Sequence, residues 1–313
     1  MGIFDFFSRK KKANPADTLM PGETKVVIQY DEKAKETPQV DADYLLERVE
    51  VIPGLAIPRA FADRWEDIAH SKATYLEIKA KPATDLSLEQ SKFAFYPMLP
   101  VGFEYPKDRN GAYMFPLAQF NFREMPHLKG YPKTGYLQFY VGTNVTHGLS
   151  LDGKPSDFKV LFFEEQEVEK YQVDFSFLNE ILAAENIPVT KPHALTFELK
   201  EEYFGLGNVE NNMNHGLTVE EIAAWYDHPL EGELLDHLYE LNNHEAHKLG
   251  GYAYFCQEDP RKNDASIREM NLLFQMKSED EIMWGDMGAA NFFIYYEDLI
   301  KKDFSKVIYH WDC

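Results

Sequence analysis

Cysteine is scarce in this sequence, and long apolar runs are missing. Cys256 and Cys313 are the only cysteines in 313 residues, and they form no Cys-x-x-Cys pair. Neither a disulfide framework nor a cysteine zinc site is therefore expected, and a reducing compartment fits this composition. No run approaches the roughly 18 consecutive apolar residues of a membrane-spanning helix. We therefore expect a cytoplasmic protein whose core is large enough to be stable without disulfides.

Cationic side chains are also in short supply. Lys and Arg number 32 against 52 Asp and Glu, so the formal net charge is −20. A surface of this sign repels the phosphates of nucleic acids and attracts cationic molecules. The charge therefore argues against a nucleic-acid partner and favours a protein partner that is basic.

The first residues depart from this balance. Apolar side chains gather at 3–7, and four cations follow at 9–12, an order opposite to that of a secretory signal. A segment of this kind can lie on an anionic membrane surface, but the acidic remainder of the chain would be repelled there. We favour a polar, mostly disordered tail over 1–42 that contributes one strand at 25–30.

The body of the chain, 43–313, alternates helical periodicity with β-type punctuation. Apolar spacing and capping residues predict helices at 58–70, 174–186 and 218–226 and one that opens at 229. Short β-branched and aromatic runs between Pro and Gly predict strands at 74–79, 115–122, 136–142, 159–164 and 195–199. The punctuation is typical of an antiparallel sheet with tight turns.

Two β-rich stretches share a spacing. Lys92 precedes Gln119 by 27 residues, and Lys248 precedes Gln275 by the same interval. Each glutamine ends an apolar run and is followed, after a loop, by a glycine-led strand with an aromatic pair. Proteins built of β-hairpins reuse strand lengths, so chance is the alternative explanation. We favour an internal duplication, because repeated units are a common way to build larger folds.

A duplication predicts the architecture. The fold class would be α+β, with two antiparallel β-rich units at about 91–145 and 247–297 and a helical insertion at about 174–246. All three parts belong to a single domain over 43–313. A cleft between two such units is the default place for a ligand.

Several short motifs resemble those of the YwqG-like family of uncharacterised bacterial proteins. They lie at 91–106, 115–122 and 135–139, at 247–252, at Gln257-Glu258-Asp259-Pro260-Arg261, at Trp284-Gly285-Asp286 and at Asp312-Cys313. The resemblance covers about 91–313 and implies a cytoplasmic α+β protein with no established activity. Some members are similar in genomic setting to proteins of toxin and immunity loci, which implies a protein partner.

The first unit departs from the family pattern at two places. Ala94-Phe95 stands where the family has a Gly-Gly pair, and Tyr105 stands where it has tryptophan. A role that needs bare backbone at this turn is therefore not expected in the first unit.

Trp284 and Asp286 form the most distinctive pair of side chains. An indole and a carboxylate at the mouth of a cleft would suit a sugar or a cationic ligand. In the plain alternative the tryptophan covers the core and the aspartate bonds backbone N–H groups of its turn. Gln119 and Gln275 are the other ligand-binding candidates, with buried amides that satisfy sheet edges as their alternative.

Three histidines, His237, His244 and His247, fall near one face if the predicted helix extends that far. His244 and His247 have the spacing of metal ligands, but no nearby carboxylate completes a ligand set. We therefore expect surface or packing histidines and no metal or other cofactor.

Catalytic signatures are absent from the sequence. It has no Gly-x-Ser-x-Gly elbow, no Walker-type loop and no complete Rossmann glycine pattern. We therefore expect an acidic protein that binds or sequesters another protein, with an immunity-like role as the most specific version, and not an enzyme. The alternative is a protein that binds a small molecule or carbohydrate, or a hydrolase, with its site in the cleft between the units.

Overall fold

The computed structural model describes residues 42–313 except 151–154, 169, 204–244, 258 and 263. Residues Ala42–Cys313 form one compact unit. The strand predicted at 25–30 and the two helices predicted after 217 lie outside the described residues. No helix in the described part of the chain is long and apolar enough to cross a membrane.

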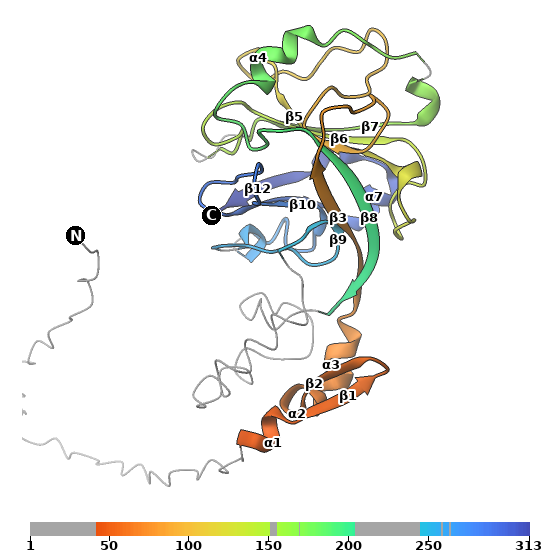
Figure 1. Cartoon of the computed structure of the whole chain (residues 1–313), viewed down its shortest axis with the longest axis vertical. Coiled ribbons are helices and arrows are strands. Elements are labelled where there is room, and N and C mark those ends of the chain that lie inside the picture. The colour runs from red at the N-terminus through yellow and green to blue at the C-terminus, as the bar shows by residue number, and fades with distance from the viewer. Residues whose placement is uncertain (1–41, 151–154, 169, 204–244, 258, 263) are drawn as a thin grey trace, which may run out of the picture. The chain divides into compact units, whose positions relative to one another are not determined.

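One antiparallel sheet dominates the described residues (Figure 1). Its ten strands follow the order β12-β11-β10-β9-β3-β8-β4-β5-β6-β7 in the part of the chain that is described. They are β3 (Ala73–Pro82), β4 (Lys92–Phe93), β5 (Phe115–Asn121), β6 (Tyr136–Val141), β7 (Phe158–Phe163), β8 (His193–Glu202), β9 (His247–Gly250), β10 (Asn271–Lys277), β11 (Ala289–Ile294) and β12 (Ile308–Asp312). The fold is therefore β-rich.

Helices are few and short in the described residues. They are α1 (Ala42–Leu46), α2 (Arg59–Ala62), α3 (Trp65–His70), α4 (Asn179–Leu182) and α7 (Tyr296–Lys301), with 3-10 turns η1 (Phe122–Glu124), η2 (Glu165–Val168), η3 (Ser176–Leu178), η5 (Pro260–Lys262) and η6 (Phe304–Lys306). A separate hairpin pairs β1 (Arg48–Ile52) with β2 (Leu55–Pro58). The helix predicted at 58–70 is thus split into α2 and α3.

The segment expected to be a helical insertion, 174–246, differs from that expectation where it is described. The helix predicted at 174–186 shrinks to η3 and α4, because Phe175 and Leu178 pack into a local core. Asp174, the predicted N-cap, accepts from the backbone N–H of Ser176 but does not cap η3. The other described residues of the segment 174–246 include the long strand β8. A layer of helices between two sheets is therefore not found among the described residues.

The sheet has two similar halves around a central pair of strands. β3 and β8 pair with each other at ten positions. β9 lies beside β3, and β4 lies beside β8. β3 therefore borders the half that follows β8 in the sequence, and β8 borders the half that follows β3. Outward from the centre the order is β4 to β7 on one side and β9 to β12 on the other. The two halves are therefore joined by non-local pairing.

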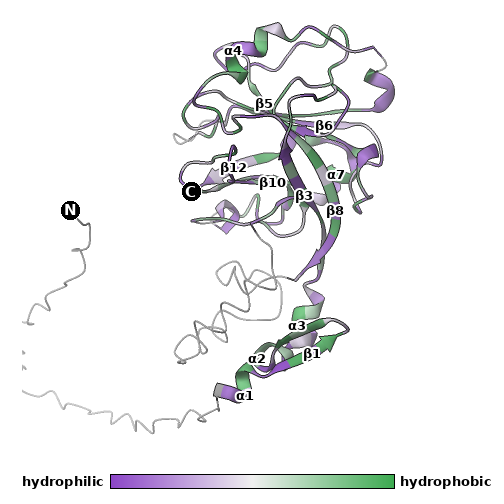
Figure 2. Ribbon diagram, viewed as in Figure 1, coloured by the Kyte–Doolittle hydropathy of each residue, from purple (hydrophilic) through white to green (hydrophobic). Residues whose placement is uncertain are grey.

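The core lies where the two halves face each other. The rings of Phe139 and Phe292 are 4.8 Å apart between centroids, and those of Phe120 and Phe274 are 5.0 Å apart. All four side chains are fully buried although they come from opposite halves. β3 and β8 also carry hydrophilic residues along their lengths (Figure 2). The contacts between aromatic rings stabilise the packing of one half of the sheet against the other.

The chain has a left-handed backbone both after β4 and at the end of β9. Ala94 and Phe95 have φ values of 56° and 76°, and Gly250 and Gly251 have 71° and 73°. A Cβ on Gly251 would collide with the carboxylate of Glu202, so glycine is needed there. The first half thus keeps the left-handed turn with larger side chains, at a cost in backbone strain.

Two lysines at equivalent positions are buried in different ways. Lys92 pairs with Gln119 across β4 and β5, and Lys248 pairs with Gln275 across β9 and β10. The Nζ of Lys248 lies 2.9 Å from a carboxylate oxygen of Glu202. The Nζ of Lys92 instead donates to backbone carbonyls, and burial lowers the pKa of Lys92 to about 7.

The buried Lys92 predicts a pH dependence of stability. Its pKa in the folded protein is below the ordinary 10.5, so the unfolded chain binds more protons between pH 7 and 10.5. The free energy of unfolding of the wild type should therefore rise relative to that of Lys92→Met across this window, by up to about 1.4 kcal/mol per pH unit. Urea titrations at several pH values measure this difference. The exposed Lys79→Met is the control, and parallel profiles for wild type and Lys92→Met would contradict the prediction.

Candidate functional site

The four predicted ligand-binding residues lie in different surroundings. Trp284, Gln119 and Gln275 are buried, whereas Asp286 is exposed. The two glutamines belong to opposite halves of the sheet. None of the four is among the residues that line the cavity described below.

Gln119 holds a loop of the first half. Its Oε1 accepts a hydrogen bond from the backbone N–H of Met98 at 2.7 Å. Gln138, its neighbour on β6, donates from Nε2 to the backbone carbonyl of Met98 at 2.6 Å. The two amides together satisfy both polar backbone groups of one buried loop residue.

Gln275 makes the equivalent contacts in the second half. Its Oε1 accepts from the backbone N–H of Tyr254 at 2.7 Å, and Asn291 on β11 donates to the carbonyl of Tyr254 at 2.8 Å. These contacts give both glutamines a structural role. A structural role for buried amides is the alternative to ligand binding that the sequence also allowed. Their role in ligand binding stays a prediction.

The histidine candidates for a metal site are only partly described. His244 and His237 lie outside the described residues. His247 is buried, with Nε2 at 3.1 Å from a carboxylate oxygen of Glu279 and Nδ1 accepting from the backbone N–H of Lys277. Burial lowers the pKa of His247. Within the described part of the chain, no group of three or more His, Cys, Asp or Glu side chains is placed to hold a metal ion.

A cavity of about 530 Å³ opens between the two halves of the sheet. One wall is the loop between β6 and β7, and the other comprises β12 and the segment before η5. The lining residues are Val145, Thr146, Leu149, Gln257, Asp259, Pro260, His310, Trp311, Asp312 and Cys313. The site predicted between two β-rich units stays a prediction, and this cavity is the candidate place for it.

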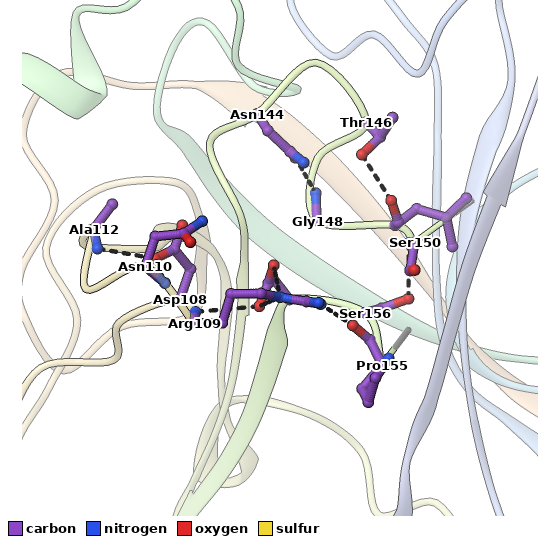
Figure 3. Close-up of polar contacts among 12 residues, drawn as sticks. Asp108, Arg109, Asn110, Ala112, Asn144, Thr146, Gly148, Ser150, Pro155 and Ser156 are labelled. Atoms are coloured by element: carbon purple, nitrogen blue, oxygen red, sulfur yellow. Dashed lines mark hydrogen bonds and ion pairs between the residues drawn. The ribbon is translucent and has the colours of Figure 1, made fainter. Parts of the chain in front are cut away.

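The first wall is a tightly wound loop. Gly148 has a φ of +82°, and its N–H donates to Oδ1 of Asn144 at 2.6 Å (Figure 3). The hydroxyl of Thr146 donates to the carbonyl of Leu149 at 2.7 Å. A Cβ on Gly148 would collide with the carbonyl oxygen of Asp157, so only glycine fits this turn.

Side chains from other segments of the chain donate hydrogen bonds to this loop. Arg109 donates from Nε to both carboxylate oxygens of Asp157, at 2.8 and 3.0 Å (Figure 3). Trp311 donates from Nε1 to the carbonyl of Thr146 at 2.7 Å, and Tyr309 donates to the carbonyl of His147 at 3.1 Å. β12 of the second half therefore holds the loop of the first half directly.

Asp312 organises the second wall. One of its carboxylate oxygens accepts from the backbone N–H of Gln257 at 2.8 Å and the other from that of Cys256 at 3.2 Å. The side chain of Gln257 in turn donates to the carbonyl of Cys313 at 2.6 Å. Two segments that are distant in sequence, 256–257 and 312–313, are thus joined at the cavity.

The second carboxylate of the cavity is already paired. Arg261 donates to the buried Asp259 from Nε and from one Nη, at 2.9 and 2.6 Å. The same guanidinium lies 4.6 Å from the centre of the Phe293 ring. Burial lowers the pKa of His310, so this imidazole is neutral at physiological pH. Asp312 is therefore the carboxylate side chain of the lining without a cationic partner among the described residues.

A family model described as a domain of unknown function (DUF1963) matches residues 91–313. The chain belongs to this family. The search of curated proteins finds no match to the sequence. The DUF1963 region contains all ten residues of the cavity lining, whereas the central strand β3 precedes it.

Two motifs of the DUF1963 region meet beside the cavity. Gly285, with a φ of +55°, packs so closely on Cys313 and Trp311 that a Cβ would collide with the Cys313 thiol. Trp284 lies behind this turn with its ring 6.0 Å from that of Trp311. The Trp-Gly-Asp run thus supports the cavity from behind, and Asp286 faces solvent.

Sequence reasoning missed the first wall and most of the second. Val145, Thr146 and Leu149 lie in a loop without a recognisable motif, and His310 and Trp311 lie in a strand that was not predicted. The second wall could have been predicted from the resemblance to the YwqG-like family, because Gln257 to Arg261 and Asp312-Cys313 belong to the motifs of that family.

Proposed function

We propose that this protein is a binding protein whose cavity accepts a cationic group, an ammonium or a guanidinium. The observation that carries the proposal is the charge of the lining. Among the ten lining residues, none is Lys or Arg, and Asp312 has no cationic partner among the described residues. A ligand cation would supply that partner.

Burial of the Asp312 carboxylate strengthens its attraction for a cation. Asp312 is only 7 % exposed, and backbone N–H groups bond both of its oxygens. A carboxylate in such a place attracts an opposite charge more strongly than one in open water. Asp259 adds little, because Arg261 already compensates it. The net charge of −20 raises the local concentration of cations around the whole molecule.

Trp311 adds an aromatic face to the lining. An indole is the ring that binds cations most strongly, at about 0.5–2 kcal/mol depending on desolvation. Val145, Leu149 and Pro260 provide apolar contact for the alkyl part of a ligand. Carboxylate, indole and aliphatic side chains together suit an alkylammonium or alkylguanidinium.

The cationic group could be presented by a small molecule or by a lysine or arginine of a basic protein. The acidic surface and the resemblance to a family with members near immunity loci support a protein source. The cavity between the two β-rich halves supports a small molecule. Both sources share the same site chemistry, and free alkylammonium compounds compared with lysine-rich peptides separate them by affinity.

We also propose that the two halves arose by internal duplication, so that the cavity lies between related units. The support is the matched register of Lys92, Gln119 and Gln138 with Lys248, Gln275 and Asn291. The amide side chains of the two sets also make the same contacts with a loop residue. The paired left-handed turns at 94–95 and 250–251 add to it.

A cation placed at the cavity should compete with the ligand. Val145 is 77 % exposed, so Val145→Arg should leave the free energy of unfolding within about 0.5 kcal/mol of the wild type. Binding of n-butylamine or butylguanidine, measured by calorimetry, should weaken at least tenfold, because the guanidinium repels the ligand and pairs with Asp312. Val145→Gln, of similar size and no charge, is the matched control and should bind as the wild type does. Unchanged binding in Val145→Arg, or none in the wild type, would refute the proposal.

A further inference from the structure

His147 is held in a costly backbone conformation beside the cavity. Its φ is +47°, in the left-handed region that residues other than glycine rarely occupy. The preceding residue, Thr146, lines the cavity, and so does Leu149 two residues further on. Strained residues of this kind concentrate at functional sites, which makes the surroundings of His147 a place to look for one.

Two polar atoms in these surroundings lack partners. Nδ1 of His147 and Nε1 of Trp284 are buried and have no hydrogen-bond partner among the described residues. Trp284 is fully buried, and His147 is 7 % exposed. An unsatisfied buried polar atom costs about 1–3 kcal/mol, so two of them in one place call for an explanation.

The two side chains contact each other. Their ring centroids are 5.4 Å apart, and the ring planes are nearly perpendicular at 88°. Both rings also contact Trp311, at 5.6 Å from His147 and 6.0 Å from Trp284. Trp311 lines the cavity, so the unpartnered pair contacts a residue of the cavity wall.

We propose that His147 and Trp284 form an inner subsite of the cavity that binds a hydroxyl group of the ligand. This inference rests on the proposed function, since it assigns the second polar group of the same ligand. The ligand would then be a small amino alcohol, with its cation beside Asp312 and its hydroxyl reaching past the edge of Trp311 to the inner pair.

A hydroxyl fits the pair better than other groups. The indole N–H only donates, so the ligand atom must accept from Trp284. Burial lowers the pKa of His147, so its ring is neutral at physiological pH, and Nδ1 donates or accepts according to the tautomer. A hydroxyl oxygen can accept from the indole while its hydrogen bonds to Nδ1, or it can accept from both rings. A carboxylate would lose its hydration without a cation to compensate it.

Matched probes test the subsite. Propanolamine and n-butylamine differ by a terminal hydroxyl in place of a methyl group, and pentanolamine and n-hexylamine form a longer pair for a deeper reach. Calorimetry on the full chain should show that the amino alcohol of one pair binds about tenfold more tightly than its alkylamine, as one or two added hydrogen bonds predict. Trp284→Phe removes the indole N–H and should abolish this preference, so that the amino alcohol and the alkylamine of each pair bind this variant with equal affinity.

A second variant tests the subsite independently of whether Trp284→Phe folds. Asparagine tolerates left-handed backbone, so His147→Asn keeps the loop conformation and removes the imidazole. It should also remove the preference for the amino alcohol, with the near-ultraviolet circular dichroism of the wild type retained.

The possible failures are distinct. Equal affinity of the wild type for both members of each pair would mean that the inner pair binds no ligand hydroxyl, and it would overturn the inference while leaving the cation-binding function intact. A preference that survives in both variants would place the hydroxyl elsewhere and also overturn it. If neither amino alcohols nor alkylamines bind the wild type, the proposed function falls together with the inference.

Discussion

Deletion of residues 1–90, which leaves the DUF1963 region, should abolish cooperative folding. The deletion removes β3, which pairs with β8 at ten positions and with β9 at four. Tyr75, Leu76 and Ile78 on this strand are at most 3 % exposed, and each would forfeit roughly 1.5–3 kcal/mol of burial. The loss also separates the two halves of the sheet, so it should exceed the usual margin of about 5–15 kcal/mol. Thermal unfolding followed by circular dichroism measures the outcome.

A shorter deletion serves as the control. Removal of 1–41 leaves the compact unit Ala42–Cys313 whole and should keep a cooperative transition within a few degrees of the full chain. A synthetic peptide of residues 71–84, mixed with the 91–313 protein, should restore part of the structure by taking the place of β3. A cooperative transition of the 91–313 protein at the midpoint of the full chain would show that the central strand is dispensable.

Lys248→Met should destabilise the protein by about 3–5 kcal/mol, because it leaves the carboxylate of Glu202 without its lysine in the core. Lys248 and Glu202 are 0 % and 1 % exposed in their side chains, and Nζ lies 2.9 and 3.1 Å from the two carboxylate oxygens. The ammonium also lies 5.0 Å from the centre of the Tyr75 ring. Urea unfolding at pH 7 measures the loss.

Two comparisons identify the cause of that loss. The double variant Lys248→Met with Glu202→Gln carries no charge at either position and retains an acceptor for the backbone N–H of Tyr252, so it should recover most of the stability. Burial raises the pKa of Glu202, so the carboxylate is the costly form and the deficit of Lys248→Met should shrink as the pH falls and Glu202 takes up a proton. A deficit that is equal in the single and double variants would instead point to lost packing of the lysine stem.

Five of the ten described strands in the large sheet could be predicted as residue ranges from the sequence, because their signals are local. The strands predicted at 115–122, 136–142 and 159–164 coincide within one residue at each end with β5, β6 and β7. Those at 74–79 and 195–199 lie inside the longer β3 and β8. Aromatic and β-branched runs between Pro and Gly specify an extended backbone wherever they stand, which is why these positions were accessible.

The helices were predicted less well where they can be compared. The stretches 58–70 and 174–186 carry helical spacing, yet the structure breaks the first into α2 and α3 and reduces the second to η3 and α4. Packing of Phe61 and Ile68 in the first, and of Phe175 and Leu178 in the second, is satisfied by single turns. Short helices depend on such tertiary contacts more than on propensity.

The sequence by itself determined the acidic charge, the positions of five strands and the equal spacing from Lys92 to Gln119 and from Lys248 to Gln275. Only the tertiary structure decided that β3 lies beside β9, that Trp284 faces the core while Asp286 faces solvent, and that a loop of one half meets β12 of the other around a cavity. The reason is physical. A strand signal depends on residues next to one another, whereas strand pairing, side-chain burial and cavity walls depend on contacts such as Trp311 with Thr146, which lie 165 residues apart in the chain.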